Sequence, residues 1–324
     1  MELVLNALKA AAEPTRLRLL TLCAHGELTV SELTQILGQS QPRVSRHLKL
    51  LCDAGLLDRF REGIWAFYRL AERGACASLA RTLVDAVPAD DATLALDLER
   101  LDAIRRARRE QAAQYFRENA GRWHEIRSLH VPEREVEAEL LRLLPTDGVS
   151  DLLDIGTGTG RILELFGPKV ARAVGVDASR EMLAVARANL EKAGLRNCQV
   201  RLADMYQLPF AGGSMDAIII HQVLHYLDEP AEALAEAARV LKPGGRLVVV
   251  DFARHELELL RSEHAHRRLG FEDEEVAGWL SQAGLVPGPV AHLKGQPLTV
   301  SLWPAQRAAA VAARSKTLAA AGAE

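Results

Sequence analysis

Apolar residues change their spacing along the chain and divide it into three stretches. Residues 1–88 show short helical segments and then the alternation of a hairpin. Residues 90–120 contain neither glycine nor proline, and their apolar positions repeat at helical spacing, which predicts one long helix. These positions are Leu94, Leu98, Leu101, Ile104, Ala107 and Ala112. From residue 150 short apolar runs alternate with amphipathic segments, a pattern typical of parallel strands joined by helices.

Size and composition fit a two-domain globular protein that does not enter a membrane. The 324 residues are 48% hydrophobic and 26% charged, which is enough for two separate cores. No apolar run approaches the roughly 20 residues that span a bilayer, and the start of the chain, MELVLNALKA, is unlike a signal peptide. We therefore expect a cytoplasmic protein. Because Cys23, Cys52, Cys76 and Cys198 stand far apart, we expect reduced thiols rather than disulfides or a zinc site.

Residues 28–57, LTVSELTQILGQSQPRVSRHLKLLCDAGLL, carry the signals of two helices joined by a tight turn. Thr29 or Ser31 suits the N-cap of the first helix, and Gly38 ends that helix. Ser40 suits the N-cap of the second helix, with a proline in the first turn behind it. The second helix is expected to bury one apolar face, formed by Val44, Leu48 and Leu51.

The opposite face of the second helix is polar and basic, as in a helix that enters the major groove. DRFREGIWAFYRL, residues 58–70, then alternates around Glu62-Gly63 and predicts a hairpin wing. Six basic and three acidic residues between positions 38 and 69 give a local charge of +3, although the whole chain has a formal charge of -3. Nucleic-acid binding must therefore come from a local patch. The predicted DNA contacts are Ser40, Gln41, Arg43, Ser45, Arg46, Lys49, Arg59 and Arg61.

A helical dimerisation domain with a solvated polar face is the alternative interpretation. The order of helix, turn, helix and basic wing favours DNA binding, and SQPRVSRHLKLLCDAGLL with REGIWAFYRL resembles the ArsR/SmtB family. This resemblance implies an α+β winged helix-turn-helix domain and a homodimer on double-stranded, palindromic operator DNA, usually as a repressor released by an effector. Such regulators often sense metals through cysteines on the first helix. Thr29 and Ser31 stand there instead, so metal sensing at this place is not expected.

A glycine-rich turn follows the first apolar run of the second domain, in LLDIGTGTGRILELF (152–166). Gly156, Gly158 and Gly160 let the backbone turn and approach a ligand without meeting a Cβ. The helix that begins at Arg161 offers free N–H groups. A dinucleotide site would show G-x-G-x-x-G. Here the third glycine comes one residue earlier, which argues against NAD.

Polar residues at the ends of the following strands indicate an adenosyl ligand. Asp177 ends a strand 21 residues after Gly156, where a carboxylate can accept both hydroxyls of a ribose. Asp204 can accept from an exocyclic amine while the Met205 N–H donates to a ring nitrogen, which together would hold an adenine. His221 ends the next strand at the same carboxyl edge.

EALAEAARVLKPGGRLVVVDF then predicts a helix, a Pro-Gly-Gly turn and a strand. Together these motifs resemble the class I S-adenosylmethionine-dependent methyltransferases. The resemblance implies a Rossmann-like α/β domain with a mostly parallel, seven-stranded sheet that binds S-adenosylmethionine or S-adenosylhomocysteine. It places Asp154 near the amino-acid end of the cofactor. A nucleotide-free or NAD-binding Rossmann domain is the alternative. The predicted cofactor contacts are Asp154, Gly156, Thr157, Gly158, Gly160, Asp177, Ala178, Asp204, Met205 and His221.

The resulting layout is multidomain. We predict a winged-helix domain at 1–88, a connecting helix at 89–125, the methyltransferase domain at 126–304 and a flexible tail at 305–324. The arginines of the connecting helix are expected to form a solvated face, with contact to the DNA backbone as the alternative. These are Arg105, Arg106, Arg108 and Arg109.

Few residues stand out as catalytic, because the sulfonium is already activated and a site acts mainly by alignment. His221 and His225 are candidates for a base or a polar lining, and a packed, hydrogen-bonded histidine is the alternative for each. The candidate pocket walls are Tyr115, Trp123 and Tyr206, with core packing as the alternative.

Metal chemistry has weak support in the second domain. A cluster of His255, His264 and His266 lacks cysteines or a defined strand, so we predict no metal site. Methylation of a metalloid would need several cysteine ligands, whereas Cys198 is the only cysteine after residue 88.

Two functions follow from the motifs. The first is a transcription regulator whose methyltransferase-like domain binds the adenosyl ligand as a signal, with the long helix as transmitter. The second is a working methyltransferase for a small molecule, whose DNA-binding domain controls its own operon. No acceptor signature such as N-P-P-Y follows Ile220, so the acceptor stays unidentified. We favour the regulator.

Overall fold

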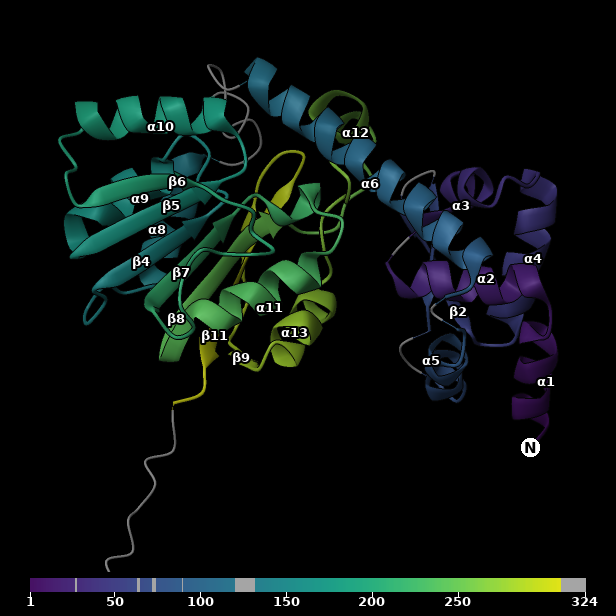
Figure 1. Cartoon of the computed structure of the whole chain (residues 1–324). Coiled ribbons are helices and arrows are strands. Elements are labelled where there is room, and N and C mark those ends of the chain that lie inside the picture. Colours follow the sequence, from purple (N-terminus) through teal and green to yellow (C-terminus); the bar gives the residue numbers. More distant parts are fainter. Residues whose placement is uncertain (27, 63–64, 72–73, 89, 120–131, 310–324) are drawn as a thin grey trace, which may run out of the picture.

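Two folded bodies are joined by one long helix (Figure 1). The structure is a computed structural model, and the residues it describes are 1–26, 28–62, 65–71, 74–88, 90–119 and 132–309. The N-terminal domain contains five helices and a small antiparallel sheet of order β1–β3–β2 among these residues. Its elements are α1 (Glu2–Ala11), α2 (Pro14–Ala24), β1 (Leu28–Thr29), α3 (Val30–Leu37), α4 (Gln41–Asp53), β2 (Leu57–Glu62), β3 (Trp65–Leu70) and α5 (Ala77–Asp85).

The helix-turn-helix forms at the residues that the sequence indicates. The Thr29 hydroxyl accepts from the Glu32 N–H, and the Glu32 carboxylate accepts from the Thr29 N–H, so α3 begins with a reciprocal capping box. Gly38 ends α3 with a left-handed backbone, φ 64°. Ser40 is the N-cap residue of α4, but its side chain makes no capping hydrogen bond. The apolar face of α4, formed by Val44, Leu48 and Leu51, is fully buried.

The long helix α6 (Ala92–Asn119) begins inside the core of the N-terminal domain. Leu101 is buried in that core, and Leu98 packs against it. Arg18 of α2 donates twice to Asp97 of α6, at 2.5 Å from Nε and 2.7 Å from Nη2, and the Asp97 side chain is fully buried. The first turns of α6 are therefore fixed to the N-terminal domain.

The C-terminal domain is a three-layer α/β structure. Its sheet has the order β10–β11–β8–β7–β4–β5–β6, with β9 also paired to β11. The strands β6, β5, β4, β7 and β8 are parallel, whereas β11 runs antiparallel to its neighbours β8, β9 and β10. The strand bounds are β4 (Asp151–Ile155), β5 (Arg172–Asp177), β6 (Cys198–Leu202), β7 (Met215–His221), β8 (Leu241–Phe252), β9 (Leu285–Pro287), β10 (Ala291–Lys294) and β11 (Thr299–Arg307).

Helices cover both faces of this sheet. The helices α11 and α13 cover one face, and α8 and α9 cover the other. The helix bounds are α8 (Glu133–Leu143), α9 (Arg161–Phe166), η2 (Gly167–Lys169), α10 (Arg180–Lys192), η3 (Leu224–Tyr226), α11 (Pro230–Val240), α12 (Leu259–His264) and α13 (Asp273–Gln282). None of the helices in the described part of the chain has the length and apolar character needed to cross a membrane.

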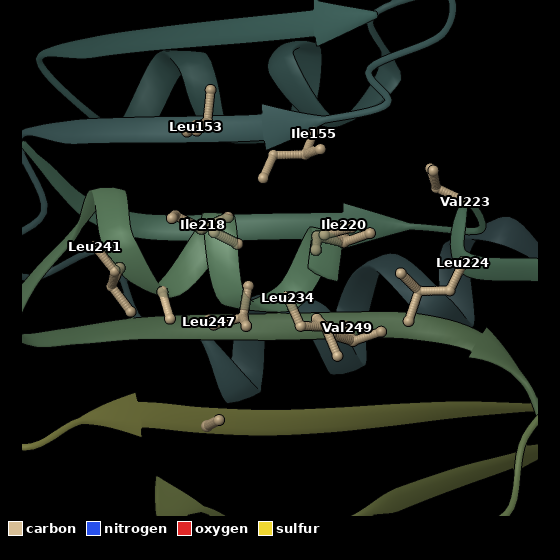
Figure 2. Packing of buried hydrophobic residues seen from close by; sticks show 14 of the residues in the cluster. Leu153, Ile155, Ile218, Ile220, Val223, Leu224, Leu234, Leu241, Leu247 and Val249 are labelled. Carbon is tan, nitrogen blue, oxygen red and sulfur yellow. The ribbon is translucent and has the colours of Figure 1, made fainter. Parts of the chain in front are cut away.

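Successive residues of the central strands enter two different apolar clusters. Ile218 and Ile220 of β7 face α11, as does Val249 of β8 (Figure 2). Ile219 and Val248, which alternate with them along the same strands, belong to the cluster on the opposite face. Burial on both faces explains why these strands are continuous apolar runs in the sequence.

Three details of the predicted C-terminal domain are wrong. The sheet has eight strands among the described residues rather than seven, because the short β9 also pairs with β11. Residues 305–307, which we assigned to a flexible tail, belong to β11 and pair with β8 and β9. The predicted Pro-Gly-Gly turn at 243–245 lies within β8, where a β-bulge shifts the register against β7 and absorbs the extra residues.

Candidate functional site

The strand order reverses between β4 and β7, and the loops after β4, β5, β6 and β7 leave the sheet at its carboxyl edge. Ile155 of β4 is paired with Val176 of β5 and with Ile220 of β7. The residues that directly follow these three positions therefore gather at one place. In open α/β sheets this reversal is where ligands bind.

The glycine loop after β4 has the conformation that the sequence predicts. Gly156, Gly158 and Gly160 have φ of 72°, 52° and 84°, a region that L side chains rarely adopt. A Cβ on Gly156 would overlap the side chain of Val223 after β7, so the two loops meet closely. The Thr157 hydroxyl is buried and has no hydrogen-bond partner among the described residues. The loop thus forms a cradle with a buried polar atom available to a ligand.

Asp177 connects the glycine loop to the end of β5. One carboxylate oxygen accepts from the Gly158 N–H at 2.8 Å, and the other accepts from the Ser179 N–H at 2.8 Å. Burial raises the pKa of this carboxyl, and the N–H groups of Ser179, Gly158 and Ala178 oppose that rise. Each oxygen keeps a second lone pair for a ligand hydroxyl, so the geometry fits an acid that binds a ribose.

The loop after β6 carries the residues predicted to hold an adenine. Asp204 is exposed two residues beyond the end of β6, and one of its oxygens accepts from the Tyr206 N–H at 2.9 Å. Met205 and Tyr206 are partly buried against the cluster beneath α11. Among the described residues, neither the second Asp204 oxygen nor the Met205 N–H is engaged in a hydrogen bond, so both can bind a ligand.

The two candidate catalytic histidines differ in their surroundings. His221 ends β7 at the carboxyl edge and is half-buried. His225 is fully buried, and its Nδ1 lies 2.7 Å from a carboxylate oxygen of Asp251 on β8. Asp251 also accepts the Phe252 N–H at 2.8 Å, which fixes the carboxylate. An imidazole that carries a proton on Nδ1 can donate it to this carboxylate and present Nε2 on its opposite side.

Asp251 was not identified from the sequence. It occupies the end of an apolar run, VVVDF, and no spacing relates it to His225. The ring of His225 also stacks on His266, with ring centroids 4.0 Å apart. The signal that could have found the pair is the presence of one acid among the last residues of a fully buried strand.

Most predicted DNA contacts of α4 lie on its solvent face. Gln41, Arg43, Arg46 and Lys49 are exposed. The remaining predicted contacts in the described part are Ser40 and Arg59, which are exposed, and Ser45, which is half-buried. Nothing is described of the Arg61 side chain. His47, in contrast, faces inward and lies 3.7 Å from Glu13.

One predicted property of the long helix is wrong. Arg105 does not lie on a solvated face, because its guanidinium pairs with Glu229 at 2.9 Å and also donates to the carbonyl oxygen of His25. Arg106 is exposed, as predicted. The side chains of Arg108, Arg109 and Tyr115, and the whole of Trp123, lie outside the described residues.

Metal ligands do not gather in the described residues, where no group of three or more His, Cys, Asp or Glu side chains is arranged to hold an ion. His264 and His266 have ring centroids 6.5 Å apart. The four cysteines are free; Cys23, Cys76 and Cys198 are buried and Cys52 is half-buried.

These features define a helix-turn-helix domain joined to a Rossmann-like α/β domain. Residues 13–59 match the family model described as "Bacterial regulatory protein, arsR family", and residues 153–249 match the model described as "Methyltransferase domain". The chain therefore combines an ArsR-type helix-turn-helix with a methyltransferase domain, and the second match supports binding of S-adenosylmethionine or S-adenosylhomocysteine.

Similar proteins match the C-terminal domain. An uncharacterized methyltransferase, YcgJ, of Bacillus subtilis is 37% identical over 100 residues, which cover 31% of this chain and 40% of that protein. A demethylmenaquinone methyltransferase of Thermus thermophilus is 41% identical over 105 residues, 31% of this chain and 46% of that protein. The crystal structure of YcgJ covers 55% of this chain and 100% of its own, with 20% identity and a TM-score of 0.48. The chain spans 34% to 63% of the length of the first curated relatives it matches.

Proposed function

We propose that the protein is a DNA-binding transcription regulator, a repressor, whose methyltransferase domain binds S-adenosylmethionine or S-adenosylhomocysteine as effector. The observation that carries the proposal is the path of α6. Its first turns are part of the N-terminal core, held by the Arg18–Asp97 pair, while its Arg105 bonds to Glu229 of the C-terminal domain. The helix α6 thus contacts both the N-terminal domain and Glu229, which lies beside the proposed pocket.

The N-terminal domain supports binding to operator DNA in the cytoplasm. The exposed groups of α4, among them Arg43 and Arg46, have the donors that contact base edges and phosphates. The exposed Arg59 on β2 adds a basic group at the wing. A charged patch of this kind on a chain with net negative charge favours a specific DNA site over indiscriminate binding.

The surface of α1 supports a homodimer. Leu3, Val4, Leu5 and Leu8 are 65%, 45%, 48% and 41% exposed, which is unusual for large apolar side chains that follow one another on a helix. Apolar surface of this density marks a protein–protein interface. A second copy that covers α1 would give the two-fold arrangement that a palindromic operator requires.

The cofactor contacts that we propose follow the geometry of the carboxyl edge. Asp177 would hold the ribose, Asp204 and Met205 the adenine, and the loop 156–160 would lie beneath the ligand. Asp154, Ala178 and His221 complete the proposed set at the ends of β4, β5 and β7. The cradle formed by the three left-handed glycines and the buried Thr157 hydroxyl fit such a ligand.

Operator binding measured at fixed salt tests the proposal. The full chain is titrated onto DNA from its own promoter region, alone and with saturating S-adenosylmethionine or S-adenosylhomocysteine. Coupling of about 1–3 kcal/mol between the two sites predicts a change of about 5- to 150-fold in affinity with at least one ligand. A change of less than twofold with both ligands would refute the effector role.

A second candidate function is methyl transfer to a small molecule, with the N-terminal domain controlling the operon. The His225–Asp251 pair favours it, because a buried carboxylate that orients an imidazole leaves the opposite nitrogen as a base. S-adenosylmethionine would supply the methyl group, while His225 would accept a proton from the acceptor. The test is release of S-adenosylhomocysteine with candidate acceptors: steady turnover supports it, and tight binding without turnover opposes it.

A further inference from the structure

Two sets of contacts between the domains lead to residues 225–229, a short segment after β7 that we call the junction segment. It lies at the carboxyl edge of the sheet, next to the proposed pocket. We infer that the junction segment transmits the ligand state of the pocket to the DNA-binding domain along two routes, one to the turn after α2 and one to the wing. The inference rests on the proposed function and adds the path by which the effector acts.

The first route runs through Arg105 of α6. Its guanidinium bonds to Glu229 at 2.9 Å and to the carbonyl oxygen of His25, which ends α2. Gly26 follows at φ 132°, and a Cβ there would overlap the Glu229 carboxylate. The turn that leads into the helix-turn-helix therefore touches the junction segment directly. Arg105 bonds to both of them, through the His25 carbonyl oxygen and the Glu229 carboxylate.

The same end of the junction segment reaches the proposed adenine loop. The Glu229 N–H donates to the Tyr206 hydroxyl at 3.3 Å, and Tyr206 directly follows Asp204 and Met205. Burial raises the pKa of Tyr206 to about 12, so the hydroxyl stays protonated and neutral near pH 7. A ligand that orders residues 204–206 therefore acts on Glu229 through a single hydrogen bond.

The second route starts at the other end of the junction segment. The carbonyl oxygen of His225 accepts the N–H groups of Arg267 at 2.8 Å and of Arg268 at 3.0 Å. The side chain of Arg267 pairs with Asp228. The loop after α12 is in this way attached to the junction segment by backbone and side-chain bonds.

Arginines of this loop and of α12 contact the wing. The guanidinium of Arg261 lies 5.5 Å from the ring centroid of Phe67, and that of Arg268 lies 5.9 Å from the ring centroid of Phe60. Both rings belong to the β2–β3 hairpin, stack on each other at 5.6 Å, and Phe67 is only 4% exposed. Cation–π contacts of this length attach the wing to the C-terminal domain.

The consequence for DNA binding is geometric. A dimeric helix-turn-helix protein needs its two recognition helices about 34–36 Å apart, one turn of the double helix. Both routes end within the N-terminal domain, on the turn after α2 and on the wing, whereas the proposed dimer contact lies on α1 of the same domain. A shift at the junction segment that moves this turn and the wing relative to α1 therefore changes the distance between the recognition helices and with it the affinity for the operator.

The charges around Glu229 support a contact that is easily altered. Burial raises the pKa of this carboxyl to about 7, with Glu232 and Asp228 adding to the rise, whereas Arg105 and Arg267 oppose it. From α2, the imidazole of His25 has a pKa lowered by burial and by Arg105. The carboxyl that bridges the domains is therefore easier to protonate than an ordinary glutamate.

The test compares variants of the full chain that cut the first route with matched exposed controls. Arg105→Gln and Glu229→Gln remove the two partners of the bridge, while Arg106→Gln on α6 and Glu191→Gln on α10 make the same changes at exposed positions outside it. Operator affinity is measured with and without S-adenosylhomocysteine, and calorimetry gives the affinity for the ligand itself. In both bridge variants we expect the ligand to change the operator affinity by less than twofold, while the affinity for the ligand itself stays within threefold of wild type. Both controls should keep the effect.

A second measurement reports on the wing. Hydrogen exchange of residues 57–62 and 65–70 should change with S-adenosylhomocysteine in the wild-type chain and in Glu191→Gln, but not in Glu229→Gln. A wild type whose operator affinity ignores the ligand refutes the proposed function. If the ligand changes the operator affinity of the wild type and of the bridge variants equally, the role of the junction segment is refuted and the proposed function is not. A bridge variant that no longer binds the ligand refutes the same role.

Discussion

Removal of the Asp177 carboxylate tests the cofactor site most directly. Its two oxygens accept the N–H groups of Gly158 and Ser179, both at 2.8 Å. The acid therefore serves two purposes in the proposal, since it fixes the glycine loop and binds the ribose of the ligand. Asp177→Ala removes the acceptor for the loop N–H groups and the proposed contact with the ribose. The first loss changes the free energy of unfolding and the second changes the free energy of ligand binding, so the two are measured separately.

The expected magnitudes follow from the number of bonds lost. Hydrogen bonds to a charged group contribute about 1.5–3 kcal/mol each, so two ribose hydroxyls give about 3–6 kcal/mol of binding, at least a 100-fold loss of affinity. The two N–H groups also lose their acceptor, which costs about 1–3 kcal/mol each in stability. Burial of the carboxylate, visible in the raised pKa of Asp177, offsets part of that cost. We expect a net loss of about 1–3 kcal/mol in the free energy of unfolding.

Calorimetric titration with S-adenosylmethionine gives the affinity, and urea unfolding gives the stability of the same preparations. Glu191→Ala, at an exposed position of α10, is the control and should match wild type in both. Asp177→Asn keeps one acceptor oxygen, so its ligand affinity and its free energy of unfolding should lie between those of wild type and Asp177→Ala. A folded Asp177→Ala protein that binds the ligand within threefold of wild type would show that the ribose lies elsewhere.

Four other changes have defined outcomes. Asp251→Ala leaves a buried imidazole without its acceptor and should lower the free energy of unfolding in urea by about 1–3 kcal/mol. Leu5→Glu combined with Leu8→Glu should turn a dimer into a monomer by sedimentation equilibrium; a wild-type monomer would contradict the α1 interface. Arg46→Ala should weaken operator binding by about 1–3 kcal/mol and leave the calorimetric affinity for S-adenosylmethionine unchanged. Because the pKa of Glu229 rises to about 7 on folding, its contribution to stability is present below pH 4.5 and falls as pH rises towards 7; Glu229→Gln should remove this slope from urea unfolding measured between these pH values.

Local and periodic features of the fold could be predicted from the sequence. The capping residue Thr29, the left-handed Gly38 and the three glycines after β4 each act through the conformation of their own backbone. The short apolar runs of β7 and β8 predict buried strands, and the two clusters show that both faces of these strands are covered. Such signals lie within a few residues of one another, so no knowledge of the tertiary structure is needed to find them.

Contacts between distant segments could not be predicted in this way. Arg105 and Glu229 are separated by 124 positions, and His225 and Asp251 by 26, with no spacing that relates the members of either pair. The run of arginines on α6 predicts a solvated face from composition alone, whereas the partner of Arg105 comes from another domain. The strand that continues to Arg307 was missed because alanine-rich sequence is typical of helices or tails, and only the pairing with β8 makes it a strand.

The strength of the contacts between the domains fits the role of a link that a ligand can change. The Arg105–Glu229 pair is partly exposed, and such ion pairs contribute about 0.2–1 kcal/mol. The contacts of Arg261 with Phe67 and of Arg268 with Phe60 contribute about 0.5–1 kcal/mol each. Their total, about 1–3 kcal/mol, equals the usual coupling energy between two allosteric sites. A large apolar interface would fix the N-terminal domain whatever the pocket holds, because a ligand can shift an equilibrium only by its differential affinity for the two states.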